Sequence, residues 1–220
     1  LLVERILRGV PSLARLRLSS LDSIEIDDRL FDLITGEPRI MPHLHLSLQA
    51  GSDMILKRMK RRHSRAQSVA IVARLKAIRP DIAIGADLIA GFPTEDDAMA
   101  ADTLALIDDA DIVHAHIFPY SERAGTPAAR MPPVPVPIRK ERADALRSAA
   151  ARRKQAWLAS LVGTRQPVLI ENPGDRGHGP NFAEVRIAKP PAGHAGLAHG
   201  TVADITITAA TDTHLIGTPS

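Results

Sequence analysis

Cysteine is absent from the 220 residues of this sequence. The chain therefore forms no disulfide bond and has no thiolate nucleophile, no thiolate-bound zinc finger and no iron–sulfur cluster held by its own thiolates. Aromatic residues make up only 3% of the sequence, and Phe182 is the sole aromatic residue after position 163. Base stacking is therefore limited as a mode of nucleic-acid binding in the C-terminal region.

Long hydrophobic runs are also absent. No stretch approaches the roughly 18 consecutive apolar residues that a membrane-spanning helix needs, and the first residues, LLVERILRGV, lack the features of a signal peptide. We expect a soluble, cytoplasmic protein with no membrane partner. The chain opens on Leu1 rather than Met, within a pattern typical of an amphipathic helix, which predicts a fragment of a longer protein.

Positive charge is unevenly distributed, although the formal net charge is only +3. The segment 57–65, KRMKRRHSR, holds six cations and no acid, whereas residues 80–122 contain no Lys or Arg. Such a basic run is more often a solvated helix face than a binding site for a polyanion. Both interpretations remain open at this point.

Short apolar runs alternate with helical patterns over residues 1–120, which predicts parallel βαβ units. Strands are expected at 16–20, 43–49, 82–91 and 112–120, and helices near 24–34, after 52, from 64 to before Pro80, and from 94. Capping boxes are expected at Asp22 with Glu25 and at Ser64 with Gln67. Thr94 with Asp97 is expected to open the helix that begins at 94. Each of these strands has an apolar face and an opposite face with polar or small residues. The polar faces favour an open barrel whose interior is accessible to water.

The C-terminal part of the sequence differs in character. Residues 124–137 hold five prolines and are expected to be extended, and a helix follows over 138–161 and ends at Gly163. Short strands at 167–171, 183–187 and 202–208 predict a small OB-like β-barrel. We therefore assign 1–137 to a barrel part, 138–163 to a connecting helix and 164–220 to a small β-barrel.

Two His-x-His pairs occupy the second and fourth predicted strands. Residues two apart on a strand point the same way, so His43, His45, His114 and His116 could supply four imidazoles to one zinc or iron ion, as in a barrel metallohydrolase. Asp87 is the one carboxylate at a matching strand position. A polar lining without a metal is the more frequent explanation of such pairs.

Four strings of residues, in this order and spacing, carry a family resemblance. They closely resemble the C-terminal part of radical S-adenosylmethionine tRNA methylthiotransferases. The four strings are RLRLSSLDSIEI, PHLHLSLQAGSDMILKRMKRRHSR, GADLIAGFPTE and HIFPYSERAGTPAARM. The combination of SSLDSIEIDDRLFDLI with HLHLSLQ is most similar to the branch that acts on N6-threonylcarbamoyladenosine beside the anticodon. The tail resembles the TRAM domain of that family. His63 and Ser64 depart from the family pattern, where Tyr and Thr are usual.

The resemblance implies a partial, open radical SAM β/α barrel that holds strands three to six, followed by the TRAM barrel. It implies S-adenosylmethionine and two four-iron four-sulfur clusters as cofactors, whose cysteine ligands this chain lacks. In the family, one cluster reduces S-adenosylmethionine to a 5′-deoxyadenosyl radical, and the other carries the sulfur that is added at carbon-2 of adenine. A missing N-terminal segment or a partner chain would supply the clusters, and the chain alone is expected to be inactive.

The resemblance also assigns residues. Those expected to line the S-adenosylmethionine pocket are Ser19, Ser47, Gln49, Arg61, Ile89, Gly91, Phe118 and Tyr120. Binding of tRNA is expected to use Lys57, Lys60, Arg62, Arg65, Arg186 and Lys189, through contacts to phosphates. The alternative to an enzyme fragment is a non-catalytic RNA-binding remnant.

Overall fold

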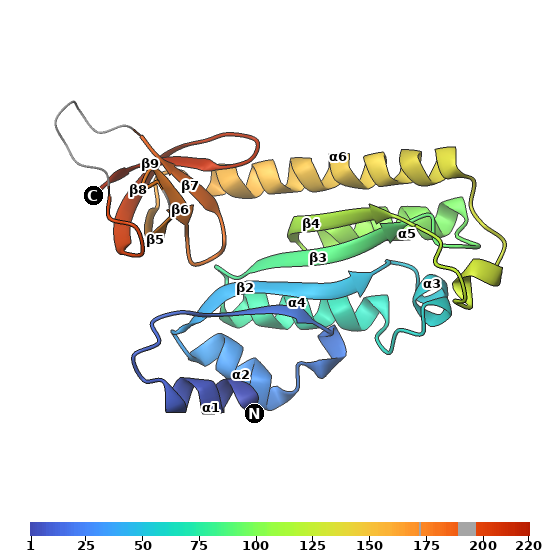
Figure 1. The fold of residues 1–220 in the computed structure, drawn as a ribbon, viewed down its shortest axis with the longest axis horizontal. Coiled ribbons are helices and arrows are strands. Elements are labelled where there is room, and N and C mark those ends of the chain that lie inside the picture. Colours follow the sequence, from blue (N-terminus) through green and yellow to red (C-terminus); the bar gives the residue numbers. More distant parts are fainter. Residues whose placement is uncertain (172, 189–196) are drawn as a thin grey trace. The chain divides into compact units, whose positions relative to one another are not determined.

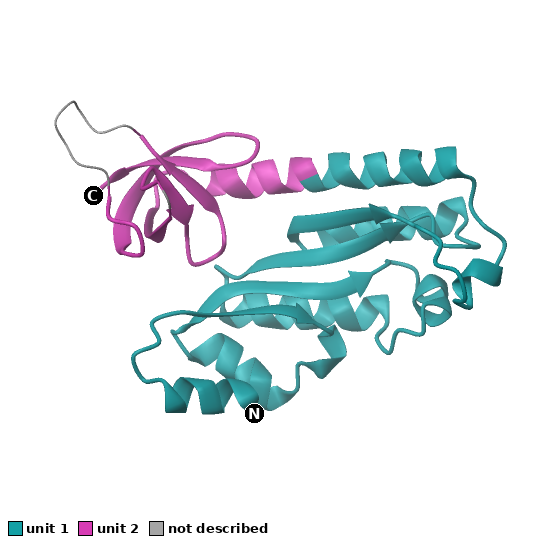
Figure 2. Ribbon diagram, viewed as in Figure 1, with its two compact units in different colours: residues 1–150 teal, residues 151–220 magenta. Residues whose placement is uncertain are grey.

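The structure, a computed structural model, describes residues 1–171, 173–188 and 197–220. It divides into two compact units, Leu1–Ala150 and Ala151–Ser220 (Figure 2). The boundary lies inside the helix α6 (Val136–Ser160), which contributes residues to both units. Each unit has a hydrophobic core of its own.

The first unit is built on a four-stranded parallel sheet with the strand order β1-β2-β3-β4 (Figure 1). The strands are β1 (Leu16–Leu21), β2 (Ile40–Gln49), β3 (Ala83–Ala90) and β4 (Ile112–Pro119). The helices are α1 (Leu2–Gly9), α2 (Asp28–Gly36), α3 (Asp53–Arg58), α4 (Arg65–Ile78) and α5 (Asp97–Asp109). The alternation of strands and helices confirms the predicted parallel βαβ units.

One face of this sheet is apolar and covered by helices. Leu44, Leu46 and Leu48 of β2 are fully buried, and they belong to a core that includes side chains of α2, α4, α5 and the first half of α6. The other face carries His43, His45, Ser47 and Gln49, as the period-2 alternation predicts.

Two predicted helix starts are wrong, and one is confirmed. Ser64 and Gln67 form the predicted capping box of α4. Helix α2 begins at Asp28 instead of near Ile24, because the Asp27 carboxylate accepts from the Leu30 N–H and a short 3₁₀ turn, η1 (Ser23–Glu25), precedes it. Helix α5 is capped by Asp96 and not by Thr94: the Asp96 carboxylate accepts from the Met99 N–H.

The second unit contains a closed barrel of five strands in the order β5-β6-β7-β9-β8. They are β5 (Arg165–Glu171), β6 (Arg176–His178), β7 (Glu184–Ile187), β8 (Val202–Ala210) and β9 (Leu215–Pro219). The prediction of a small β-barrel is confirmed, although β6 and β9 were not among the predicted strands. Before it, the segment predicted as extended includes a 3₁₀ turn, η2 (Ala128–Arg130), and α6 begins two residues earlier than predicted.

None of the helices in the described ranges is long and apolar enough to cross a membrane.

Candidate functional site

Two adjacent depressions lie at the carboxyl ends of β2, β3 and β4, the edge at which parallel α/β folds bind ligands. The first, of 450 Å³, is lined by four of the predicted pocket residues, Gln49, Ile89, Phe118 and Tyr120. The second, of 420 Å³, shares Gln49 and Ile89 and adds Arg61 and Lys60. The structure thus brings five of the eight predicted pocket residues to one edge of the sheet. We call these two depressions the strand-end cavity.

Gln49 ends β2 in an unusual backbone conformation. Its φ is 67°, in the left-handed region that residues other than glycine seldom occupy. The pairing of β2 with β3 also shifts register between Leu46 and Gln49. Gln49 lines both depressions, and such backbone outliers are frequent at functional sites.

Arg61 is held in place by two hydrogen bonds, one to the backbone of β2 and one to Asp22, which follows β1. Its Nη2 donates to the Ser47 carbonyl at 2.8 Å and to the Asp22 carboxylate at 3.2 Å. The Asp22 carboxylate also bonds His63 Nδ1 at 3.1 Å. Asp22 therefore does not cap a helix as predicted; it positions Arg61, whose Nε is buried without a hydrogen-bond partner among the described residues.

Gly91 lines neither depression, and the structure provides a packing reason for a glycine at this position. Its φ is +70°, and an added Cβ would lie 2.5 Å from Cγ of Arg139 on α6. The Gly91 N–H donates to Glu95 Oε1 at 2.9 Å, and the same oxygen accepts from Arg142 at 2.9 Å. Burial raises the pKa of Glu95, against the opposing effects of Gly91 and Arg142.

Ser19 and Ser47 also lie outside the two depressions. Ser19 is exposed on β1, a strand at the edge of the sheet. Ser47 is half-buried and takes part through its carbonyl, which accepts from Arg61.

Several residues of the strand-end cavity were not predicted. Asp87 could have been found from the alternation of β3, which puts it on the same face as Ile89. Residues 121–128 come just after β4, and residues that follow a strand at this edge often line a ligand site. Their place in the sequence could therefore have predicted that they line the cavity. The unpredicted lining residues of the first depression are Asp87, Phe92, Pro119, Ser121, Arg123, Thr126 and Ala128.

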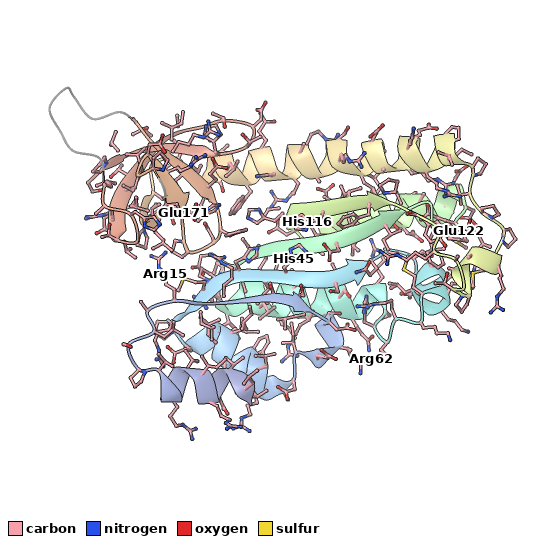
Figure 3. The ribbon with its side chains drawn as sticks, in the orientation of Figure 1. Arg15, His45, Arg62, His116, Glu122 and Glu171 are labelled. Atoms are coloured by element: carbon pink, nitrogen blue, oxygen red, sulfur yellow. The ribbon has the colours of Figure 1, made fainter. Side chains whose placement is uncertain are left out.

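The histidines form two different pairs on the open face. His43 and His114 are in edge-to-face contact, with ring centroids 5.3 Å apart, and burial lowers the pKa of His43 to about 3, with smaller contributions from His114 and Arg17. His45 and His116 lie side by side (Figure 3), with centroids 4.7 Å apart, and both reach Asp87. The four imidazoles therefore do not surround one point, and the four-histidine metal site is wrong.

The cations of the basic run have different partners. Arg62 pairs with Glu25 at 2.6 Å, and Arg65 pairs with Asp109. Lys57 and Lys60 have no ion-pair partner in the described part of the chain, and both line a third depression of 340 Å³ beside Arg62. In the barrel, Arg186 pairs with Glu184 at 3.1 Å, and Lys189 lies outside the described residues.

Comparison with known proteins identifies the family. Residues 14–107 match the radical SAM superfamily. The chain is 51% identical over 188 residues to the threonylcarbamoyladenosine tRNA methylthiotransferase MtaB of Rickettsia prowazekii (strain Madrid E), covering 86% of this chain and 44% of the relative. It is 38% identical over 169 residues to the tRNA-2-methylthio-N(6)-dimethylallyladenosine synthase of Agrobacterium fabrum, covering 76% of this chain and 37% of that relative.

The chain thus spans less than half the length of either relative. Three observations point to the same family: the four strings of residues, the parallel sheet with its strand-end cavity, and the two relatives. The chain belongs to the radical S-adenosylmethionine methylthiotransferase family.

Proposed function

We propose that this chain is the cofactor-binding and RNA-binding part of an enzyme that adds a methylthio group to carbon-2 of N6-threonylcarbamoyladenosine next to the anticodon of tRNA. The observation that carries the proposal is the strand-end cavity, at which five predicted pocket residues meet. The choice of nucleoside rests on the relatives: the identity is 51% to the threonylcarbamoyladenosine enzyme and 38% to the dimethylallyladenosine enzyme.

The residues of the cavity fit S-adenosylmethionine. Each depression, of 450 and 420 Å³, is within the usual range for a small-molecule site. Ile89, Phe118 and Tyr120 offer apolar and aromatic surface to an adenine ring, and the Gln49 amide offers both a donor and an acceptor. The Arg61 guanidinium lines the second depression, and its Nε has no hydrogen-bond partner among the described residues; a guanidinium suits a carboxylate. Bound there, S-adenosylmethionine would supply the radical chemistry of the family.

The residues of this chain do not fit an iron–sulfur cluster. The sequence contains no cysteine, and the clusters of this family are held by thiolates. We therefore propose that the cluster ligands come from a segment or partner chain outside these 220 residues. The chain by itself then binds and orients but does not catalyse.

We assign residues 164–220 to a TRAM domain that contacts tRNA. Residues 1–137 are then the radical SAM barrel part, and 138–163 are the connecting helix. The order β5-β6-β7-β9-β8 supports an OB-like barrel. Among its described strands, β7 and β9 pair in parallel and the other pairs are antiparallel. Phosphate contacts from basic side chains suit this unit better than base stacking, since Phe182 is its one aromatic residue after α6. A tRNA-modifying enzyme of this kind would be cytoplasmic.

Binding of S-adenosylmethionine to the 220-residue chain tests the proposed pocket. In isothermal titration we expect Gln49→Ala to weaken binding about three- to ten-fold, the effect of losing one hydrogen bond. Gln155→Ala is the matched control, because Gln155 bonds Asp212 and lies outside the cavity. Equal affinities of the two variants would contradict the pocket.

The identity of the nucleoside needs a separate experiment. The chain is supplied with a cysteine-containing segment from the relative that is 51% identical, and tRNA nucleosides are then analysed by mass spectrometry. We expect a methylthio group on N6-threonylcarbamoyladenosine and none on N6-dimethylallyladenosine. The chain alone, reconstituted with iron and sulfide, should form no 5′-deoxyadenosine.

A further inference from the structure

Three side chains from three adjacent strands converge on the open face of the sheet. His45 comes from β2 and His116 from β4 (Figure 3). Asp87 comes from β3, the strand between them. His45 Nε2 lies 3.0 Å and His116 Nδ1 lies 3.2 Å from the same oxygen, Asp87 Oδ1. One potential ligand atom of each residue lies within 4.8 Å of the others, and within the described ranges this is the one such group of histidines and acids.

Two of the three spacings between these ligand atoms match those around a small metal ion. In a tetrahedral zinc site with bonds of about 2.0–2.1 Å, neighbouring ligand atoms are about 3.3 Å apart. The two distances to Asp87 Oδ1 are close to that value, so an ion fits with small side-chain rotations. A pair of imidazoles with one carboxylate suits transition metals and not magnesium or calcium, which prefer sites made of oxygen ligands.

We propose that His45, Asp87 and His116 bind a divalent transition-metal ion, with zinc as the first candidate. All three ligands come from this chain, and none of them is a cysteine. Asp87 also lines the strand-end cavity, and the His116 side chain is 64% exposed. The remaining coordination positions are therefore accessible to solvent or to a small ligand, as in metal sites with three protein ligands.

The position of His45 depends on Gly85, its partner in register on β3. A Cβ at Gly85 would lie 2.5 Å from His45 Nδ1, so the ring lies directly over the backbone of the neighbouring strand. The absent side chain leaves room for the ring, whose Nε2 faces Asp87. The pair His43 and His114, two residues earlier on the same strands, has a ring contact with each other but belongs to no such group of ligands.

Cobalt titration tests the site directly. The 220-residue chain, without a histidine tag and in a His178→Ala background that removes the partly buried pair with Glu171, is titrated with Co²⁺ and followed by visible absorption. Zn²⁺ is then added. We expect one equivalent of Co²⁺ to bind with a four- or five-coordinate spectrum and Zn²⁺ to displace it.

His116→Ala is the decisive variant, because a side chain that is 64% exposed can be removed without loss of the fold. We expect it to weaken Co²⁺ binding at least about ten-fold, the lower range for disturbing a metal site. His114→Ala, on the same face of the same strand, should leave affinity unchanged. Absence of saturable binding, or equal affinities of the two variants, would overturn the proposal.

Discussion

The two faces of the parallel sheet use the same strands for opposite purposes. On β2, Leu44, Leu46 and Leu48 point to the helices and are fully buried, whereas the residues between them bring imidazole, hydroxyl and amide groups to the open face. The alternation of a strand allows both, because neighbouring side chains point to opposite faces. The comparison teaches that stability and ligand binding can be changed separately here, often at consecutive positions.

The largest effect is expected on the covered face. Leu46→Ala removes a side chain that is 0% exposed in the core, and such changes lower the free energy of unfolding by about 3–5 kcal/mol. Ser47→Ala, one position later on the open face, should cost less than about 1 kcal/mol, since it keeps the carbonyl that Arg61 uses. Urea unfolding followed by circular dichroism measures both, and similar losses would remove the distinction between the faces.

A smaller loss is expected from breaking a buried ion pair, that of Glu95 and Arg142. Glu95 and Arg142 have side chains that are 1% and 13% exposed, and Arg142→Met leaves the Glu95 carboxylate buried without its cation. The cost should be about 3 kcal/mol at pH 7, the lower end of the range for breaking a buried pair, because the Gly91 N–H still donates to this carboxylate. Burial already raises the pKa of Glu95, and loss of Arg142 raises it further. Protonation then relieves the cost, so the loss relative to wild type should shrink from pH 7 to pH 5.

The open face should show its own pH dependence. The pKa of His43 is lowered from 6.5 to about 3 by burial, so the folded state favours the neutral imidazole. Above pH 6.5 the imidazole is neutral in both the folded and the unfolded state, so its titration does not change stability. As the pH falls from 6.5 toward 3, only the unfolded state takes up the proton, and the free energy of unfolding falls by at most about 1.4 kcal/mol per pH unit. Unfolding of His43→Leu between pH 7 and pH 5 should give a flatter profile than wild type, and identical slopes would contradict this.

The smallest effect concerns tRNA binding by the basic run. Lys57 and Lys60 have no intrachain ion pair among the described residues, while Arg62 and Arg65 pair with Glu25 and Asp109. Replacing both lysines by Gln should therefore flatten the slope of log affinity against log salt by up to about 1.8, at about 0.9 per phosphate contact. Arg62→Gln with Arg65→Gln is the matched control and should change the slope less in fluorescence anisotropy.

The strands were predictable because their periodicity is local, and so was the start of α4, since Ser64 and Gln67 meet within one helical turn. The start of α2 was not, because Asp22 binds His63, 41 residues away in sequence, instead of capping a helix. The strand β6 has only three residues, too few for a periodic pattern.

The same limit applies to the site. Spacing predicted that His45 and His116 lie on the polar face of their strands, but it did not show which histidines a carboxylate joins, since that depends on the register of β2, β3 and β4. Gly91 was assigned to an adenine contact by resemblance, whereas its contact with Arg139 requires the position of α6. Contacts between distant segments therefore account for what sequence reasoning missed.

The described strands of the second unit close into a barrel, whereas β1 and β4 each pair on one side only. An unpaired strand edge has free backbone donors and acceptors and is a template for another strand. On heating or at high concentration, edge-to-edge pairing of the parallel sheet should therefore cause aggregation before the barrel does. Charged substitutions on β1, where Ser19 and Ser20 are already exposed, offer a route to a better-behaved protein.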